Sequence, residues 1–304
     1  MDARMHELSF DSAALRGLSE KLLRSHYQNN YGGAVKRLNA IRSQLHELAF
    51  TSAPGFQLNG LKREELIATN SVLLHELYFD SLGGAGAAMV PAMELALRAS
   101  FGSLARWREE FVALGKALGG GSGWVLLVFQ PREGTLVNQW AADHTHAIAG
   151  GVPLLALDMY EHAYHLDFGA AAGEYVDAFM DNLHWARVYA RYQQAVEHAS
   201  EAFGAGQDEV EGAFVVDVRR SAVFEQSEAV IPGARWRDPG DVGTWAASLP
   251  PDRDVVVYCV YGHEVGRATA LRLRAAGIRA RYLRGGIDAW TAAGQPLQSK
   301  GGAT

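Results

Sequence analysis

The stretch VPLLALDMYEHAYHLDFG, from Val152 to Gly169, decides the fold. It begins as an apolar run typical of a buried strand and then becomes acidic, aromatic and rich in histidine. Asp158 and His162 stand just past the apolar run, where the backbone can turn and point both side chains at one centre. Such a pair could bind a metal, although an Asp with a His four residues later is more often a salt-bridged surface pair. Metal binding therefore requires partner ligands from elsewhere in the chain.

The composition limits the class of protein. With 304 residues, 48% of them hydrophobic and 20% charged, the chain can bury more than one core, so we expect two or three domains. The net charge of -6 and the lack of a long basic run argue against binding to nucleic acid or an acidic membrane. The charged start resembles no signal peptide and no stretch reaches transmembrane length, so we expect a cytoplasmic protein with no membrane partner.

Periodicity predicts helices, then a sheet, then a helix up to about residue 198. Apolar residues at helical spacing predict a helical hairpin, and apolar runs after glycines predict strands. The predicted elements are helices at 12–48, 63–82 and 102–118, strands at 123–130, 134–142 and 151–159, and a helix at 175–199.

The last hundred residues follow a different pattern. A small, acidic segment reads as a linker, and beyond it short strands alternate with helices, which indicates a parallel sheet. The predicted fold is therefore α+β, with a helical hairpin and three-stranded antiparallel sheet followed by a small α/β domain. The predicted divisions are a hairpin domain at 1–88, a metal-binding α/β domain at 89–198, a linker at 199–210 and a last domain at 211–304.

Two further histidines could complete a metal site. His26 lies in KLLRSHYQNNY and His75 in SVLLHELYF, both beside leucines rather than on charged faces. A lone histidine on an apolar face is usually a satisfied core residue. Two facing helices that each aim a histidine inward would, with Asp158 and His162, make a three-histidine, one-carboxylate site. Such a donor set suits a redox-active first-row metal.

Residues 10–195 resemble the iron/manganese superoxide dismutase family. The motifs that carry the resemblance are LSEKLLRSHYQNNYGGAVKRLNAI, HELYF, FGSLARWREEF, GSGWVLLV, VPLLALDMYEHAYHLDFG and NLHWARVYARY. The resemblance implies one iron or manganese ion per subunit, held by His26, His75, Asp158 and His162. It also implies superoxide as the substrate, which the family converts to oxygen and hydrogen peroxide, and it places Tyr78 and Trp124 around the ligands.

The sequence departs from that family around the ligands. The gateway tyrosine falls on Ala34, a further histidine on Asn30, and the signature's tryptophan and last tyrosine become Tyr160 and His165. The usual outer-sphere glutamine is replaced by His144, or else by His146, unless both are loop histidines in water. By resemblance, Glu161 bonds to His162 of a second subunit, which implies a homodimer or a dimer of dimers; otherwise it is a surface carboxylate.

Cys259, the one cysteine, ends the apolar run DVVVY and precedes a helix. Backbone N–H groups at a helix N-terminus stabilise a thiolate, so we expect the pKa of this thiol to be lowered and the thiol to be reactive. The alternative is a buried structural cysteine.

Residues 208–298 resemble the rhodanese family through VVDVRRSAVFEQSEAVIPGARW, VVVYCVYGHEVGRATALRLRAAG and YLRGGIDAW. The resemblance implies a sulfurtransferase in which Cys259 carries a persulfide and Asp217 and Arg219 are structural. The implied sulfur-site loop comprises Val260, Tyr261, Gly262, His263, Glu264 and Val265, followed by Arg267. Glu264 and Val265 replace the arginine and the serine or threonine usual for thiosulfate, a change for which Arg267 could compensate. A neutral persulfide donor, or a sensory thiol, fits about as well.

Three functional hypotheses follow. The first is an iron- or manganese-dependent superoxide dismutase with a sulfurtransferase domain. The second is a diverged metalloprotein in persulfide or sulfide oxidation, with Cys259 handling the sulfur. The third is a redox or sulfur sensor without turnover.

Overall fold

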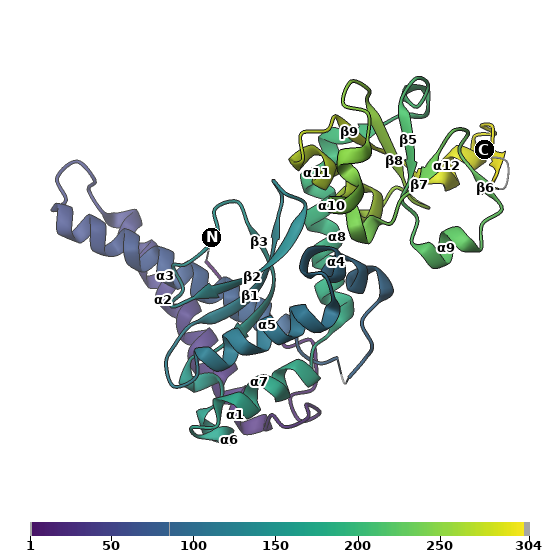
Figure 1. The fold of residues 1–304 in the computed structure, drawn as a ribbon. Coiled ribbons are helices and arrows are strands. Elements are labelled where there is room, and N and C mark those ends of the chain that lie inside the picture. Colours follow the sequence, from purple (N-terminus) through teal and green to yellow (C-terminus); the bar gives the residue numbers. More distant parts are fainter. Residues whose placement is uncertain (1, 85, 301–304) are drawn as a thin grey trace.

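Two long helices, α2 (Gly32–Glu47) and α3 (Gly55–Asp80), form an N-terminal hairpin (Figure 1). The computed structural model describes residues 2–84 and 86–300. The outer limits of the predicted domains 1–88 and 211–304 therefore lie outside the described residues, as does residue 85. The predicted hairpin is confirmed, but helix begins later than Ser12. The helix α1 (Glu20–Ser25) starts where the Ser19 hydroxyl accepts the Leu22 N–H, and a π-helical turn joins it to α2 at His26–Tyr31.

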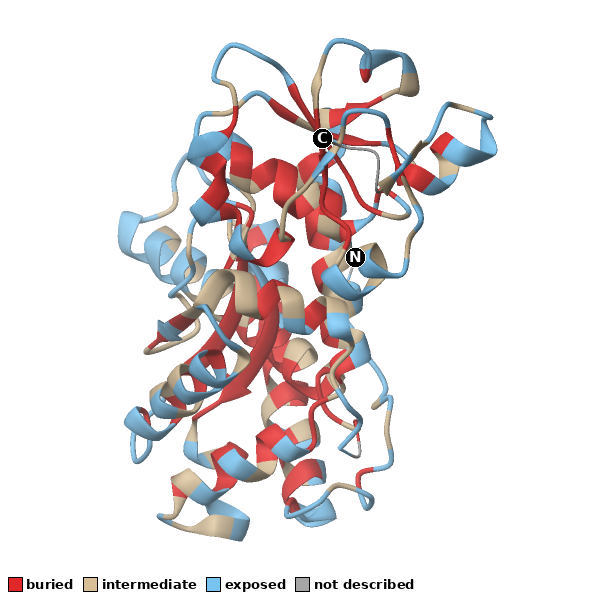
Figure 2. Cartoon of the chain, turned by 45° about the vertical axis from the view of Figure 1, so that its right-hand side comes forward, coloured by how far each residue is buried: buried red, intermediate tan, exposed pale blue. Residues whose placement is uncertain are grey.

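The three predicted strands are confirmed as one antiparallel sheet, in the order β2-β1-β3. Their bounds are Trp124–Gln130 (β1), Thr135–Ala141 (β2) and Val152–Asp158 (β3). The central strand is buried over almost its whole length, as Figure 2 shows in red, because helices cover the sheet. This explains why β1 reads as a continuous apolar run rather than an alternating one.

Helices missed or misjudged from the sequence surround this sheet. The helix α4 (Pro91–Phe101) was not predicted; it starts on a proline and ends at Gly102, whose φ of 84° suits glycine. The remaining helices of this part are α5 (Leu104–Ala117), the single 3-10 turn Glu161–Ala163, α6 (His165–Phe168), α7 (Ala172–Asp181) and α8 (Trp185–Ser200).

The single helix predicted at 175–199 is wrong, because the chain leaves the helix between α7 and α8. Leu183 forms an isolated antiparallel bridge with Leu82. The fully buried Asn182 accepts the Arg16 N–H (2.9 Å) and donates to the Arg16 carbonyl (2.7 Å). These contacts fix the segment around Arg16, the end of the hairpin at Leu82 and the helices α7 and α8 to one another.

A five-stranded parallel sheet forms the core of the C-terminal part, in the order β4-β9-β8-β5-β7. Its strands are β4 (Gly204–Ala205), β5 (Phe214–Asp217), β7 (Arg235–Trp236), β8 (Val255–Tyr258) and β9 (Ala280–Leu283). Its helices are α9 (Ser221–Glu225), α10 (Val242–Trp245), α11 (Glu264–Ala275) and α12 (Gly286–Ala292), and β6 (Ala229–Val230) pairs separately with β10 (Gln298–Ser299). Part of the stretch 199–210, expected to be a linker, thus belongs to this sheet through β4.

Helix α11 joins the N-terminal part of the chain, which ends with α8 at Ser200, to the C-terminal part, which begins with β4 at Gly204. It lies beside α8 (Figure 1), and its Ala268 and Leu271 belong to the same buried cluster as the N-terminal core. A Cβ on Gly134 would lie 2.7 Å from the Cβ of Leu271, so only glycine allows this close approach. Arg272 donates to the Gly134 carbonyl at 2.9 Å. In the described part of the chain, no helix is long and apolar enough to cross a membrane.

We expect Asn182→Ala to lower the free energy of unfolding of the N-terminal part by about 1–3 kcal/mol, because it removes a fully buried side chain that bonds to both the N–H and the carbonyl of Arg16. Asn39→Ala is the matched control: Asn39 makes the same two bonds to Ala3, but it is only partly buried, so water can replace them. Thermal unfolding of both variants measures the difference. Equal losses would contradict the role given to burial.

Candidate functional site

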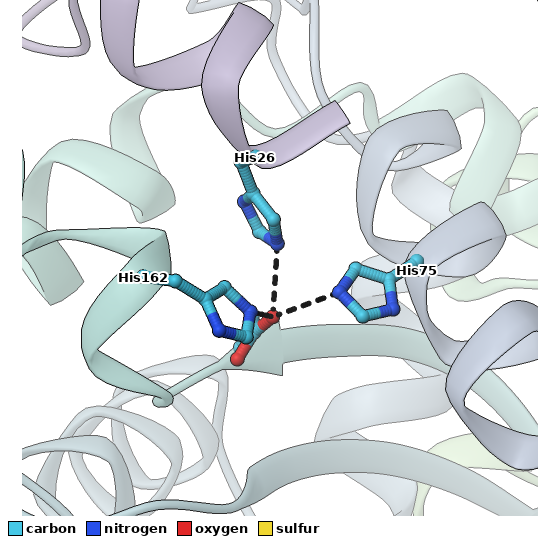
Figure 3. Close-up of side chains that lie close together, drawn as sticks. His26, His75 and His162 are labelled. Carbon is cyan, nitrogen blue, oxygen red and sulfur yellow. Dashed lines mark hydrogen bonds and ion pairs between the residues drawn. The ribbon is translucent and has the colours of Figure 1, made fainter. Parts of the chain in front are cut away.

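Three histidines surround one carboxylate between the hairpin and the sheet (Figure 3). The Nε2 atoms of His26, His162 and His75 lie 3.0, 3.2 and 3.6 Å from Oδ2 of Asp158. One ligand atom from each of the four residues lies within 4.8 Å of the others. The π-helical turn supplies His26, α3 supplies His75, the end of β3 supplies Asp158, and the 3-10 turn after β3 supplies His162. The structure thus brings together all four predicted ligands.

A hydrogen bond to Ser71 determines which nitrogen of His75 faces Asp158 with a lone pair. Its Nδ1 lies 2.6 Å from the Ser71 carbonyl, and a carbonyl can only accept, so Nδ1 carries the proton. Its buried Nε2 therefore presents a lone pair to Asp158 and has no hydrogen-bond partner within the described residues. Two electron-rich atoms facing each other in a buried site are compatible with a metal ion, and nitrogen and oxygen donors suit a first-row metal.

The protonation states agree with this interpretation. Burial lowers the pKa of His75 to about 3, helped by the charge of His26, and burial also lowers the pKa of His26. Burial would raise the pKa of Asp158, but the hydrogen bonds from His162 and His26 outweigh it and hold that pKa well below its usual value. His26 and His75 are therefore neutral and Asp158 is ionised, the forms that bind metals.

Residues around the ligands fix their orientation. The Tyr160 N–H donates to the second oxygen of Asp158 (2.9 Å), and the Tyr175 hydroxyl donates to the Asp158 carbonyl (2.8 Å). The Tyr175 hydroxyl also lies 3.3 Å from that of Tyr78, whose ring lies against His26 with centroids 4.9 Å apart. Tyr175 was missed from the sequence because no motif marks it; α7 shows only core periodicity.

Of the two predicted outer-sphere histidines, only His144 lies next to the site. The Trp124 indole donates to its Nδ1 at 2.9 Å, and its ring stacks on Tyr160. By contrast, His146 is exposed, and its Nδ1 accepts the Ala142 N–H.

A pocket of about 330 Å³ leads to the ligands, and Glu161 lies outside it. Asn30, Ala34 and Arg37 line the pocket together with His75, His144 and His162. Ala34 leaves open the space that a tyrosine side chain would fill. Glu161 is exposed, and its carboxylate makes no hydrogen bond among the described residues.

The Cys259 thiol lies in a second site, after β8. Its Sγ is close to Gly266, where an added Cβ would lie 3.3 Å away, and the turn at Gly286 supports the loop because Ile287 donates to the Cys259 carbonyl at 3.0 Å. The expected lowering of its pKa is wrong: burial raises the pKa, and the backbone N–H groups of Gly266, Gly262 and His263 oppose the rise without cancelling it.

The loop's charged residues also differ from expectation. Arg267 does not compensate for Glu264 at the thiol, because its guanidinium donates to the Gly262 carbonyl (3.0 Å) and to the Ser200 hydroxyl (3.2 Å). A pocket of about 200 Å³ beside Cys259 is instead lined by Arg220, whose guanidinium makes no hydrogen bond or ion pair in residues 2–84 and 86–300. Asp217 and Arg219 form a buried pair, as their structural role implies.

Comparison with known proteins finds relatives of the N-terminal part of the chain. The chain is 64% identical over 192 residues to "Superoxide dismutase [Fe]" of Cupriavidus metallidurans, a match that covers 63% of this chain and 97% of that protein. It is 33% identical to "Superoxide dismutase [Mn] 1" of Haloferax volcanii (64% and 98% covered). It is 31% identical to "Superoxide dismutase [Fe]" of Aquifex pyrophilus (60% and 88% covered).

The hairpin, the antiparallel sheet and the donor set of three histidines and one aspartate between them define a metalloprotein of the helical-hairpin and α/β type. Residues 90–191 match the family model described as "Iron/manganese superoxide dismutases, C-terminal domain", and residues 198–293 match "Rhodanese-like domain". The chain belongs to the iron/manganese superoxide dismutase family, with a rhodanese-like domain at its C-terminal side.

We expect Asp158→Asn to reduce bound iron or manganese by about tenfold or more, because a neutral amide replaces the anionic ligand at the centre of the donor set. Elemental analysis of the purified full chain measures the metal. Asp143→Asn is the matched control, since Asp143 is a loop carboxylate bonded to Thr145 and should leave the metal content unchanged. Equal metal in both variants would contradict the assigned site.

Proposed function

We propose that the chain catalyses the dismutation of superoxide at an iron or manganese ion held by His26, His75, Asp158 and His162. The convergence of three imidazole nitrogens on one buried carboxylate oxygen carries the proposal. The identity of 64% to an iron superoxide dismutase supports it and favours iron as the first metal to test. When bound, the metal would supply the one-electron steps that convert two superoxide ions and two protons into oxygen and hydrogen peroxide.

Residues around the metal site orient its histidines and line the access pocket. Ser71 fixes the orientation of His75 through its carbonyl, and Trp124 fixes that of His144. Because Trp124 donates to Nδ1 of neutral His144, the proton of His144 lies on Nε2, where it can serve as a hydrogen-bond donor. Arg37 also lines the access pocket, where Glu64 partly neutralises its positive charge through an ion pair. Ala34 contributes no hydroxyl, so proton delivery depends on these other groups and on water.

The assembly, compartment and domain division belong to the same proposal. A homodimer, or a dimer of dimers, is supported by the exposure of Glu161 next to His162, whose side chain is 28% exposed. We propose a cytoplasmic location. We also propose the division 1–88, 89–198 and a C-terminal domain that starts near Gly204 rather than at 211, because β4 pairs with β9.

Full-length protein loaded separately with iron and with manganese tests the dismutation. We expect rapid loss of superoxide with at least one metal, and a fall of about a hundredfold or more in His75→Ala, which removes a ligand. Metal content is measured in the same samples. If wild-type protein binds stoichiometric metal but dismutes superoxide no faster than His75→Ala, the metal site stands and the dismutase activity does not.

For the C-terminal domain we propose sulfur transfer at Cys259. The thiolate attacks the outer sulfur of a donor such as thiosulfate or an organic persulfide. The new S–S bond makes a persulfide on Cys259, and sulfite or the donor thiolate leaves with the bonding electrons. An acceptor thiolate or cyanide then attacks that outer sulfur, and the Cys259 thiolate leaves. The match of residues 198–293 to a rhodanese-like domain and the loop N–H groups around Sγ support this proposal.

Thiocyanate formation from cyanide, with thiosulfate or glutathione persulfide as the donor, tests the sulfur transfer. We expect turnover by wild type and none by Cys259→Ser, because a hydroxyl forms no persulfide. Because burial raises the pKa of the thiol, the rate should increase with pH through the alkaline range. Equal rates for both proteins would show that Cys259 is not the sulfur carrier.

A further inference from the structure

The carboxylate of Glu264 is held by the N-terminal part of the chain. Glu264 is the first residue of α11 and is only 7% exposed. The Tyr189 hydroxyl donates to Oε1 (2.7 Å), and the Gln193 amide donates to Oε2 (3.1 Å). Tyr189 and Gln193 lie one turn apart on α8, so a single helix face supplies both donors. Both oxygens of the carboxylate are therefore bonded to α8.

The same carboxylate borders the pocket that contains Cys259, and so do Tyr189 and Ala92 from the N-terminal part. A negative charge near the thiol opposes formation of a thiolate, or of a persulfide anion, and repels an anionic donor. The ionisable or charged side chains around this pocket come from α8, from the turn after β5 and from the loop itself: Tyr189, Arg219, Arg220, Tyr261, His263 and Glu264.

We propose that Tyr189 and Gln193 are positioning residues for the sulfur site: they hold both oxygens of the Glu264 carboxylate against α8 and so limit how strongly this charge acts on the Cys259 sulfur. The dismutase part thereby sets the reactivity of the rhodanese-like part, through contacts that a separate rhodanese-like domain would lack. The inference rests on the proposed sulfur transfer for its kinetic readout only; the reactivity of the thiol tests it independently.

Other contacts hold α11 in place, so the two donors can be removed without separating the parts. Arg267 bonds to Ser200 on α8, and Arg272 bonds to the Gly134 carbonyl and to the Ser100 hydroxyl. Loss of one hydroxyl on α8 should therefore change where the Glu264 carboxylate lies and leave the docking of α11 intact.

The test uses the full, metal-loaded chain and the variants Tyr189→Phe, Glu264→Gln and their combination. Cys259 is the one cysteine, so its alkylation by iodoacetamide across a pH series reports on a single thiol. We expect Tyr189→Phe to shift this profile to higher pH and slow alkylation near neutral pH about fivefold, because the released carboxylate moves toward the sulfur. It should also raise KM for thiosulfate more than it lowers kcat. In Glu264→Gln the profile should shift to lower pH, and adding Tyr189→Phe should change it no further.

Tyr192→Phe is the matched control, since it removes a hydroxyl from the same helix that makes no hydrogen bond within the described residues. A Tyr189→Phe profile that matches wild type, or a Tyr189→Phe shift that persists with Glu264→Gln, would overturn the positioning role. If wild type transfers no sulfur but the alkylation shift occurs, the proposed sulfur transfer fails and the positioning role stands. If wild type transfers sulfur and Tyr189→Phe changes neither the alkylation profile nor the kinetics, the proposed sulfur transfer stands and the positioning role fails.

Discussion

The carboxylate of Asp158 is fully buried at the end of β3, and the arrangement of the N-terminal part depends on it. An unpaired charge at such a place would cost several kcal/mol, because little water can reach it. Hydrogen bonds from the imidazoles of His26 and His162 compensate it, and His75 presents a lone pair that a metal ion would share with it. The hairpin can therefore pack on the sheet only where His26 and His75 reach β3. The same side chains thus determine both the metal site and the position of the hairpin on the sheet.

The sequence predicted those parts of the molecule that local patterns encode. Continuous apolar runs indicated the three strands, and histidines beside leucines on two helices pointed to the four ligands. The break between α7 and α8 could not be predicted, because its cause is a contact between Asn182 and Arg16, 166 residues apart. The strand β4 is only two small residues and exists through its pairing with β9.

The errors at the sulfur site have a related cause. The helix N-terminus after Cys259 suggested a low pKa for the thiol, and its N–H groups do act in that direction. Burial acts more strongly in the other direction, and burial is a property of the folded chain rather than of the motif. The position of Arg267 in the sequence likewise suggested a cation near the sulfur, whereas its guanidinium reaches Ser200 in the other part of the chain.

Two buried carboxylates thus play opposite parts in one chain, and their partners explain the difference. Around Asp158, His26 and His162 lie within hydrogen-bond distance of Oδ2, but His75 presents a lone pair to the same oxygen, an arrangement that a bound cation would stabilise. Around Glu264, Tyr189 and Gln193 offer protons, so both oxygens are occupied. A lone pair turned toward a buried carboxylate favours a metal ion between the two groups, whereas a carboxylate with a hydrogen-bond donor on each oxygen is structural. Because the donors to Glu264 belong to α8 and the carboxylate to α11, that structural role also ties the sulfur site to the fold that holds the metal site.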